Sequence, residues 1–435
     1  MNKKIYLLII LLLSQLVLYK GKLLLAEENT ISSAKYKAKN IDYNYYIKLV
    51  RDHNLSYAAE KLNLSISEAN ISAAKVFNDP NISFEYANND DNKMMMGQSY
   101  TASISKTFSI AKRSARINLA KSEHELSLEL LKDYFSKLRA EATINYLDAI
   151  KQKELYKLKL DSYQTINKLA IGDSLKHNLG KITQVNAYQS RLEANLALNE
   201  LLKAKAELFN SYANLYNLIG NFTPDTLYIP NEKLSIQKRN YSFEQLISNA
   251  LNTRTDLLAT FKNIDLADKQ LKLTKSEKNI DFDLELGFNH NTQVRNELAP
   301  APKFNGISVG ISIPLKFSNF NKGSLKSAQY SLAQAQKHYE QAQLQVKVDL
   351  LQAISSYESD YKKVENFNTG MLSKAKMVID GKIYSYNRGE TSLLEVLDAQ
   401  RTYNDVFALY IESLYDLAVS LINLEQSAGI WDIEL

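Results

Sequence analysis

The sequence predicts an α+β protein of very long helices and two pairs of short strands, in which one structural unit occurs twice. Three observations support this. Only 13 of the 435 residues are Gly and 6 are Pro, so residues that break helices are scarce. Two segments alternate apolar and polar residues with the period of a β-strand. One turn sequence also recurs, as "NLGKITQVNAYQSRLEA" from Asn178 and "NRGETSLLEVLDAQRTY" from Asn387.

The N-terminus has the features of a secretory signal peptide. Two lysines precede an apolar run, Ile5–Tyr19, that is short for a membrane helix. We expect residues 1–26 to be removed after Ala26, and residues 27–41 to form an N-terminal segment. An uncleaved membrane anchor is the alternative for this run.

Charge and cysteine content restrict the possible partners. The formal net charge is +5, but residues 1–26 contain four lysines and no acid, so the mature chain has 49 basic and 48 acidic residues. A nearly neutral chain gives no reason to expect nucleic-acid binding. The chain has no Cys, which excludes disulfides and a lipid anchor attached to cysteine.

The two halves of the chain align with each other at an offset of 200 to 209 residues. Gly180 and Gly220 recur as Gly389 and Gly429, and the segment at 51–57 aligns with the one at 251–257. The predicted organisation is a first repeat at 42–220, a linker at 221–242 and a second repeat at 243–430.

Each repeat contains one pair of amphipathic strands, near 81–109 and near 281–317. In the second pair one face is apolar, formed by Phe282, Leu284, Leu286 and Phe288, then Ile307, Val309, Ile311, Ile313, Leu315 and Phe317. Asp283, Glu285 and Ser308 lie on the other face. Nine to eleven tilted residues match a strand that crosses an outer membrane with its apolar face toward lipid. A soluble sheet with one buried face is the alternative, but such long helices would not cover it compactly.

Long helices follow each strand pair. We expect one from about Ile117 to His177 and another from about Gly323 to Tyr384. The second has a narrow, Ala-rich heptad seam formed by Leu325, Ala328, Leu332, Ala335, Tyr339, Ala342 and Val346. Such a seam favours helices packed side by side in a wall, although a plain coiled-coil rod has the same periodicity.

These segments together resemble the TolC family of outer-membrane efflux proteins over essentially the whole mature chain. The matching pieces include "TRTDLLATFKNIDLADKQLKLTKSEKNIDFDLELGF", "GISIPLKFSNFNKGSLKSAQYSLAQAQ" and "YNRGETSLLEVLDAQRTYNDVFALYIESLYDLAVSLINLEQSAG". The resemblance implies a homotrimer in which four strands per chain build one twelve-stranded transmembrane β-barrel. A long α-helical barrel would continue it into the periplasm of a Gram-negative bacterium.

The resemblance also implies a function. The protein would be the outer-membrane channel of a tripartite efflux system, a passive exit duct surrounded by outer-membrane lipid. Its partners would be a periplasmic adaptor (membrane fusion) protein and an inner-membrane efflux transporter. The exit duct of a type I protein secretion system is the alternative within transport, and an exported coiled-coil structural or adhesion protein is the alternative from another class. The sequence contains no signal for the cargo, which could be metal ions, drugs, peptides or proteins.

Two groups of site residues follow from the turns. Gly ends a long helix at each hairpin tip, so each tip is an exposed turn with irregular backbone. We therefore expect the tips, with Gly180, Lys181, Gly389 and Glu390, to dock the adaptor. The resemblance implies that an aperture is formed near the second turn by Tyr386, Glu395 and Asp398. Six carboxylates from three chains would repel each other, raise some carboxyl pKa values and favour cations. At this turn the arginine that is usual in the family is replaced by Thr391.

Catalytic chemistry is not indicated. The five histidines have no spacing typical of a metal site, and no phosphate-binding loop or nucleophile motif is present. We therefore expect neither an enzyme nor a cofactor.

Overall fold

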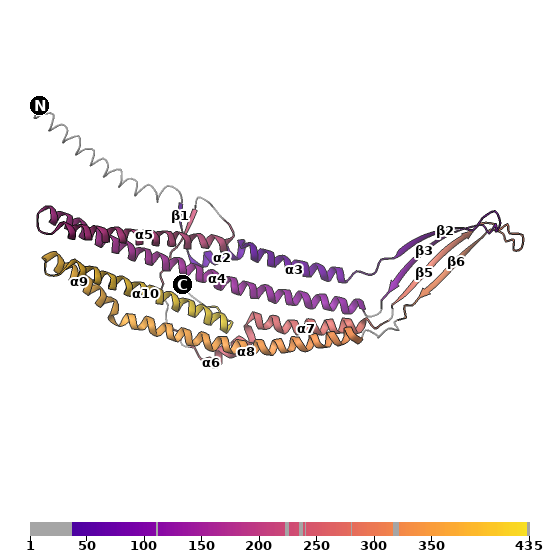
Figure 1. Cartoon of the computed structure of the whole chain (residues 1–435). Coiled ribbons are helices and arrows are strands. Elements are labelled where there is room, and N and C mark those ends of the chain that lie inside the picture. Colours follow the sequence, from indigo (N-terminus) through magenta and orange to yellow (C-terminus); the bar gives the residue numbers. More distant parts are fainter. Residues whose placement is uncertain are drawn as a thin grey trace, which may run out of the picture.

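The computed structural model describes residues 37–109, 112–221, 226–234, 238–239, 241–279, 281–315 and 322–432. The predicted signal peptide at 1–26 and its cleavage after Ala26 lie outside these residues. The molecule is elongated, with a wall of helices that is continued at one end by a sheet (Figure 1). Across the described ranges, none of the helices is both long enough and apolar enough to cross a membrane.

The elements follow the same order in both halves of the chain. The first half contains β1 (Lys37–Ile41), α2 (Tyr43–His53), α3 (Leu55–Ala74), β2 (Asn81–Asn88), β3 (Gln98–Phe108), α4 (Lys112–Asn178) and α5 (Gln184–Ile219). The second half contains β4 (Thr226–Pro230), α6 (Phe243–Thr253), α7 (Thr255–Ser276), β5 (Phe282–Asn291), β6 (Phe304–Ser312), α8 (Lys322–Asn366), the π-helical segment η2 (Phe367–Met371), α9 (Leu372–Arg388) and α10 (Leu393–Ala428). This order is consistent with two repeats, whose bounds stay a prediction.

Two helices precede each strand pair. In the first half the break is at Asn54, whose side chain accepts a hydrogen bond from the Tyr57 amide at 2.8 Å and so caps α3. The Asn54 amide group also donates to the Leu218 carbonyl at the end of α5, at 2.7 Å. In the second half Arg254 is at the break and donates to the Ser427 carbonyl at the end of α10, at 3.3 Å.

A glycine lies against each break. Gly220 has a φ of +74°, and a Cβ there would lie 2.6 Å from the carbonyl oxygen of His53. Gly429 has a φ of +67°, and a Cβ there would lie 3.0 Å from the backbone nitrogen of Arg254. Because only glycine permits both the left-handed conformation and this approach, α5 stacks end to end with α3, and α10 with α7.

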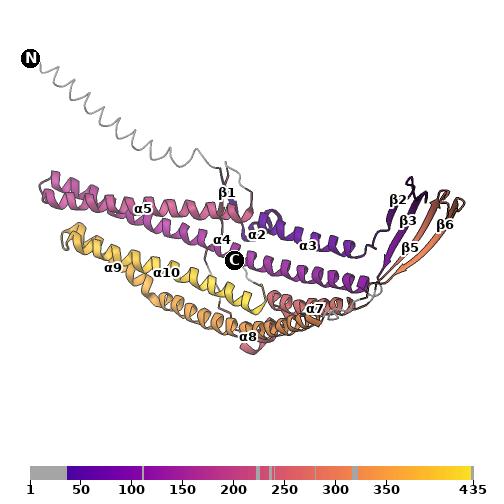
Figure 2. The same cartoon turned by 45° about the vertical axis from the view of Figure 1, so that its right-hand side comes forward.

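The wall therefore has four columns (Figures 1 and 2). Two are the stacked pairs, and the others are α4 and the α8–η2–α9 series. In the wall α4 packs between α3 and α5 on one side and α7 and α10 on the other, while α8 covers α7 and α10. Fully buried side chains concentrate near the middle of the wall, among them Tyr46, Tyr146, Leu215, Leu350, Leu417 and Ile422. There β1 pairs in parallel with β4, a small sheet that the sequence did not predict.

The two long helices differ from each other. The first is confirmed as one helix, α4, whose 67 residues span about 100 Å and pass through Gly172 without interruption. The second predicted helix, from about Gly323 to Tyr384, is present but is divided into α8 and α9. The helix is interrupted by η2, where Gly370 has a φ of +104°. Such π-helical segments kink a helix locally.

The four strands form one antiparallel sheet in the order β2-β3-β5-β6. One row across it consists of apolar residues, Phe84, Ala102, Phe288 and Ile307, and the next row, on the other face, consists of Ser83, Ser103, Gly287 and Ser308. The predicted apolar and polar faces are therefore present. The last strand was predicted to reach Phe317, but β6 ends at Ser312, because Pro314 lacks the N–H group needed for pairing. Phe317 itself lies outside the described residues.

The junction at Gly220 can be tested against the turn at Gly180. Gly220→Ala combines left-handed strain, about 1–2 kcal/mol, with a clash against His53, whereas Gly180 has a similar φ of +69° and open space around it. We expect Gly220→Ala to lower the free energy of unfolding clearly more than Gly180→Ala does. Chemical denaturation followed by far-UV circular dichroism measures both, and equal losses would show that the stacking does not require glycine.

Candidate functional site

The two hairpin tips lie together at the end of the wall opposite the sheet (Figure 1). Both turns are closed by the same pair of backbone hydrogen bonds. Gly180 and Lys181 donate to the carbonyls of His177 and Lys176, each at 2.8 Å, and Gly389 and Glu390 donate to those of Tyr386 and Ser385 at 3.0 and 2.9 Å. Gly180 and Gly389 are left-handed, with φ of +69° and +78°. The turn role expected for these glycines is confirmed.

Each turn leads into a capped helix. The side chain of Thr183 accepts from the amide of Asn186 at the start of α5. Ser392 begins α10 with a capping box, in which its side chain and that of Glu395 each bond to the backbone of the other residue. The four predicted docking residues Gly180, Lys181, Gly389 and Glu390 are all exposed. The ion pair between Arg388 and Glu390, at 2.8 Å, lies on the surface of the second tip.

Tyr386 connects the two hairpins. Its hydroxyl donates toward the carboxylate of Asp173 on α4 and lies 2.8 Å from both carboxylate oxygens. Asp173 is 1% exposed and also accepts a hydrogen bond from the hydroxyl of Ser190 on α5. The Lys176 ammonium lies 3.5 Å from Asp173 and 4.4 Å from the centre of the Tyr386 ring. One buried carboxylate therefore joins α4, α5 and α9.

This arrangement keeps the tyrosine protonated. Burial, together with the hydrogen bond to Asp173 and its charge, raises the pKa of Tyr386 above its ordinary value. The hydroxyl therefore remains a donor at neutral pH. A buried carboxylate without partners would be costly, so the hydrogen bonds to Asp173 favour close contact of the two hairpins.

Sequence reasoning missed Asp173. The signal was its position four residues after the buried Leu169 on α4, on the inward stripe of the helix. A carboxylate at an inward position requires a partner, but the periodicity does not show which residue supplies it. The partner is Tyr386, 213 positions away in the chain.

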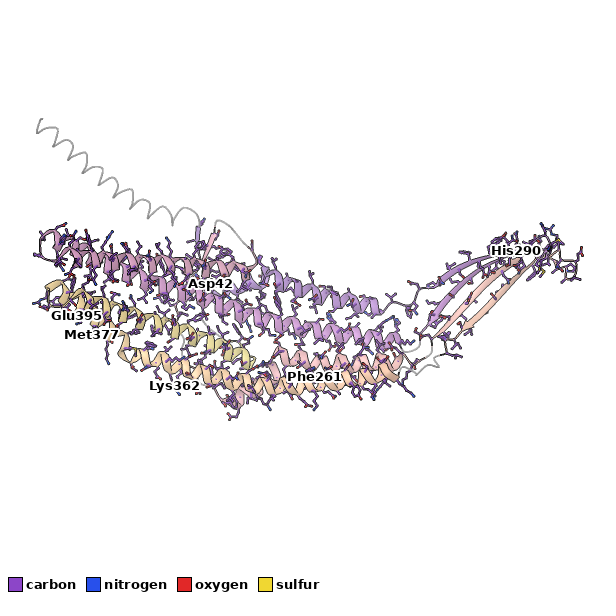
Figure 3. All side chains as sticks on the ribbon, viewed as in Figure 1. Asp42, Phe261, His290, Lys362, Met377 and Glu395 are labelled. Atoms are coloured by element: carbon purple, nitrogen blue, oxygen red, sulfur yellow. The ribbon has the colours of Figure 1, made fainter. Side chains whose placement is uncertain are left out.

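The other two predicted aperture residues lie on α10 and have different surroundings. Glu395, at the tip end of the molecule (Figure 3), accepts from the Lys382 ammonium of α9 at 2.6 Å. This hydrogen bond is the main cause that lowers the pKa of Glu395 to about 2. Within one chain the pKa of Glu395 is therefore lowered, whereas crowded carboxylates in a trimer were expected to raise some carboxyl pKa values. Asp398 is exposed one turn further along α10. Within one chain, Tyr386 thus contacts Asp173 and Glu395 contacts Lys382.

A cleft lies beside the contact between Tyr386 and Asp173. It is lined by α4 residues, among them Leu169, Gly172 and Lys176, and by Ile383 and Asn387 of α9. Across the described part of the chain, no group of three or more His, Cys, Asp or Glu residues could hold a metal ion.

Comparison with known proteins identifies relatives of the whole architecture. The family described as "Outer membrane efflux protein" matches residues 246–430. The cobalt-zinc-cadmium resistance protein CzcC of Cupriavidus metallidurans is 25% identical over 350 residues, which are 80% of this chain and 80% of that protein. The outer membrane protein TolC of Vibrio cholerae is 24% identical over 73% of this chain and 70% of its own length.

Solved structures share the fold at lower sequence identity. The CmeC outer membrane channel of Campylobacter jejuni superposes with a TM-score of 0.73 at 13% identity and covers 89% of this chain and 85% of its own. The open state of the MtrE outer membrane channel of Neisseria gonorrhoeae gives a TM-score of 0.69 at 14% identity, with 89% and 88% covered. The α+β fold of this chain is therefore the fold of these channels.

The contact between the hairpins can be tested by removing one hydroxyl. Tyr386→Phe deletes the bond to a buried charged group, which contributes about 1.5–3 kcal/mol, and we expect the amides of α9 to exchange with deuterium about tenfold faster or more. The matched control is Tyr384→Phe, because Tyr384 is 61% exposed and its hydroxyl accepts a hydrogen bond from the exposed Arg388. Equal exchange in both variants would contradict the role of Tyr386.

Proposed function

We propose that this chain is an outer-membrane efflux protein of the TolC family and that it forms the passive exit duct of a tripartite efflux system. These relatives are outer-membrane proteins by name, and in this proposal the sheet lies in the outer membrane and the helices extend into the periplasm. The observation that carries the proposal is the four-stranded sheet at the end of the helical wall. Its apolar face is exposed, with Phe84 at 82%, Ile307 at 83% and Val309 at 67%.

The sheet has the form of one third of a barrel. Its outer strands are β2 and β6, and each pairs on only one side within the chain. Strand direction alternates through the sheet, so β6 of one copy can continue antiparallel to β2 of the next. Three copies would close twelve strands without a free edge, as a lipid environment requires. The polar rows then line the lumen and the apolar rows contact lipid.

The helical wall also has two edges suited to neighbouring copies. On the edge formed by α5, exposed apolar residues include Val185, Tyr188, Leu192 and Leu196. On the opposite edge, formed by α8 and α9, they include Leu344, Leu351, Met377 and Val378. Met377 points away from the other helices of the chain (Figure 3). Contact between unlike edges closes into a ring, and a ring of three walls would enclose a periplasmic tunnel.

We propose that the tip end is the aperture of this tunnel. The Tyr386–Asp173 contact would hold the second hairpin against the first and keep the aperture narrow. The α9 segment lies between Gly370 and Gly389, which are both left-handed, so it can tilt as a unit when this contact breaks. The exposed turns at Gly180, Lys181, Gly389 and Glu390 are the proposed docking points for the periplasmic adaptor, and an inner-membrane transporter would deliver the cargo.

The placement of the sheet is tested by two neighbouring substitutions on β5. Leu286 lies on the apolar face and Glu285 on the polar face. Leu286→Arg puts a charge in lipid at a cost of about 2–4 kcal/mol, so we expect loss of heat-modifiable trimers from outer-membrane fractions, while Glu285→Arg should assemble normally. Equal loss in both variants would contradict the assignment of the two faces, and trimers at parental level with Leu286→Arg would contradict the membrane placement.

The aperture is tested by single-channel recording. If Glu395 and Asp398 face the tunnel, a trimer would bring six carboxylates there against the three Lys382 ammoniums that pair with Glu395. The net charge stays negative, and we expect a cation-selective pore that multivalent cations block. The double variant Glu395→Ala with Asp398→Ala should lose the block and much of the selectivity. The control, Glu200→Ala with Glu207→Ala, removes the same charge from exposed positions of α5. Currents that the α10 double variant leaves unchanged would place both acids outside the lumen.

A further inference from the structure

A second cleft lies where the sheet meets the helices. It has a volume of about 580 Å³ and lies between the segment that follows α3, the end of β3 and the start of α4. Its apolar lining includes Phe77, Phe108 and Phe282, and its basic lining includes Lys106, Arg113 and Arg116. In the placement proposed above, on which this inference rests, the helices extend into the periplasm. This cleft therefore lies at the boundary between the periplasm and the membrane.

The cleft carries excess positive charge. Residues 74–79, 106–109, 112–116 and 281–282 contain five basic residues and two acids. Lys112 is already paired with Asp281. Among the residues that the structure describes, Lys106, Arg113 and Arg116 form no ion pair with a carboxylate. The two arginines instead donate to backbone carbonyls at the end of α3, whose partial charges offset only part of their positive charge.

Lys106 occupies an unusual position for a charge. It lies between Ile104 and Phe108 on the apolar face of β3 and is opposite Leu284 on β5. Its ammonium is 5.8 Å from the ring centre of Phe77 and 6.0 Å from that of Phe108. A lysine on the lipid-facing side at the end of a strand extends its ammonium toward the headgroups, while its stem contacts apolar surface.

Arg113 complements this lysine. Its guanidinium carbon lies 4.1 Å from the ring centre of Phe77, which is 65% exposed. Its Nε and Nη2 donate to the Lys75 carbonyl at 2.9 and 2.6 Å, so the N–H groups of Nη1 remain for a ligand. An arginine held in this way is suited to bind a phosphate through charge-assisted hydrogen bonds.

We propose that this cleft binds the phosphate headgroup of an anionic phospholipid from the periplasmic leaflet, with Lys106 and Arg113 as its ligands. The acyl chains would lie against the apolar face beside Phe108, Ile104 and Leu284. Cations, aromatic rings and an adjoining lipid-facing surface together match a phospholipid, since a free phosphate ion would need no apolar neighbours. Three copies in a trimer would anchor the barrel at this leaflet without a covalently attached lipid.

The test is native mass spectrometry of the full-length protein in detergent, with phosphatidylglycerol or phosphatidylcholine as the probe. We expect the protein to retain phosphatidylglycerol in preference to phosphatidylcholine. The affinity for phosphatidylglycerol should fall about fivefold for each cation removed, first in Lys106→Gln and again in the double variant Lys106→Gln with Arg113→Gln. The control, Lys203→Gln with Lys205→Gln, removes equal charge from exposed positions of α5 and should retain the lipid. Because Arg113 donates to the Lys75 carbonyl, its replacement can disturb the end of α3. The single variant Lys106→Gln tests lipid binding without that disturbance.

Three results would overturn the inference. They are equal retention of the two lipids, equal retention by the cleft and control variants, and complete displacement of phosphatidylglycerol by excess inorganic phosphate. None of them affects the proposed duct, because trimer assembly and channel currents are measured separately. Absence of the unmodified protein from the outer membrane would instead contradict the proposed function.

Discussion

The close approach of two glycines to two helix breaks determines the shape of the helical wall. At Gly220 and Gly429 the end of one helix meets the start of another, and a Cβ would lie 2.6 Å and 3.0 Å, respectively, from a backbone atom of the facing helix break. Asn54 and Arg254 then hydrogen-bond the last carbonyls of the incoming helices. Each stacked pair, α5 with α3 and α10 with α7, is nearly as long as the continuous α4. All four columns can therefore run from the tips to the sheet.

The packing along the wall is uneven, and this has functional consequences. Large buried side chains concentrate in the middle, where the small β1–β4 sheet and the glycine junctions also lie. Near the tips the apolar cluster is small, formed by Leu169, Ile379, Val396 and Ala399. There the polar contacts of Asp173 join the two hairpins, and the Lys382–Glu395 ion pair joins the two helices of the second hairpin. Polar contacts between few groups open at a lower free-energy cost than a packed core, which suits the aperture proposed at this end.

In the proposed duct the other end of the wall meets lipid instead of water. Among the described residues no apolar layer covers the sheet, so its exposed face would contact lipid and its outer strands would pair with strands of neighbouring copies. The basic cleft beneath the sheet follows from the same geometry. The chain passes from α3 into β2 and from β3 into α4 at the same end of the wall. The basic residues of these two connections therefore gather where headgroup phosphates would lie. In the proposed trimer, membrane contact and the pairing of subunits would thus be linked at a single junction.

Local patterns in the sequence were sufficient for the four strands of the large sheet, for the long helices as a class and for the turns, but not for the small β1–β4 sheet. Period-two alternation predicted the two faces of the sheet, and the repeated Asn-x-Gly predicted the left-handed turns at Gly180 and Gly389. The same patterns did not show that α4 continues through Gly172 while Gly370 interrupts the second long helix, since both are single glycines in helical sequence. They also did not reveal the partners of Asp173 and Glu395. Periodicity determines which face of an element is apolar, but only the tertiary structure decides which distant residue lies opposite a given side chain. The contacts at Gly220, Asp173 and Glu395 depend on that second kind of information.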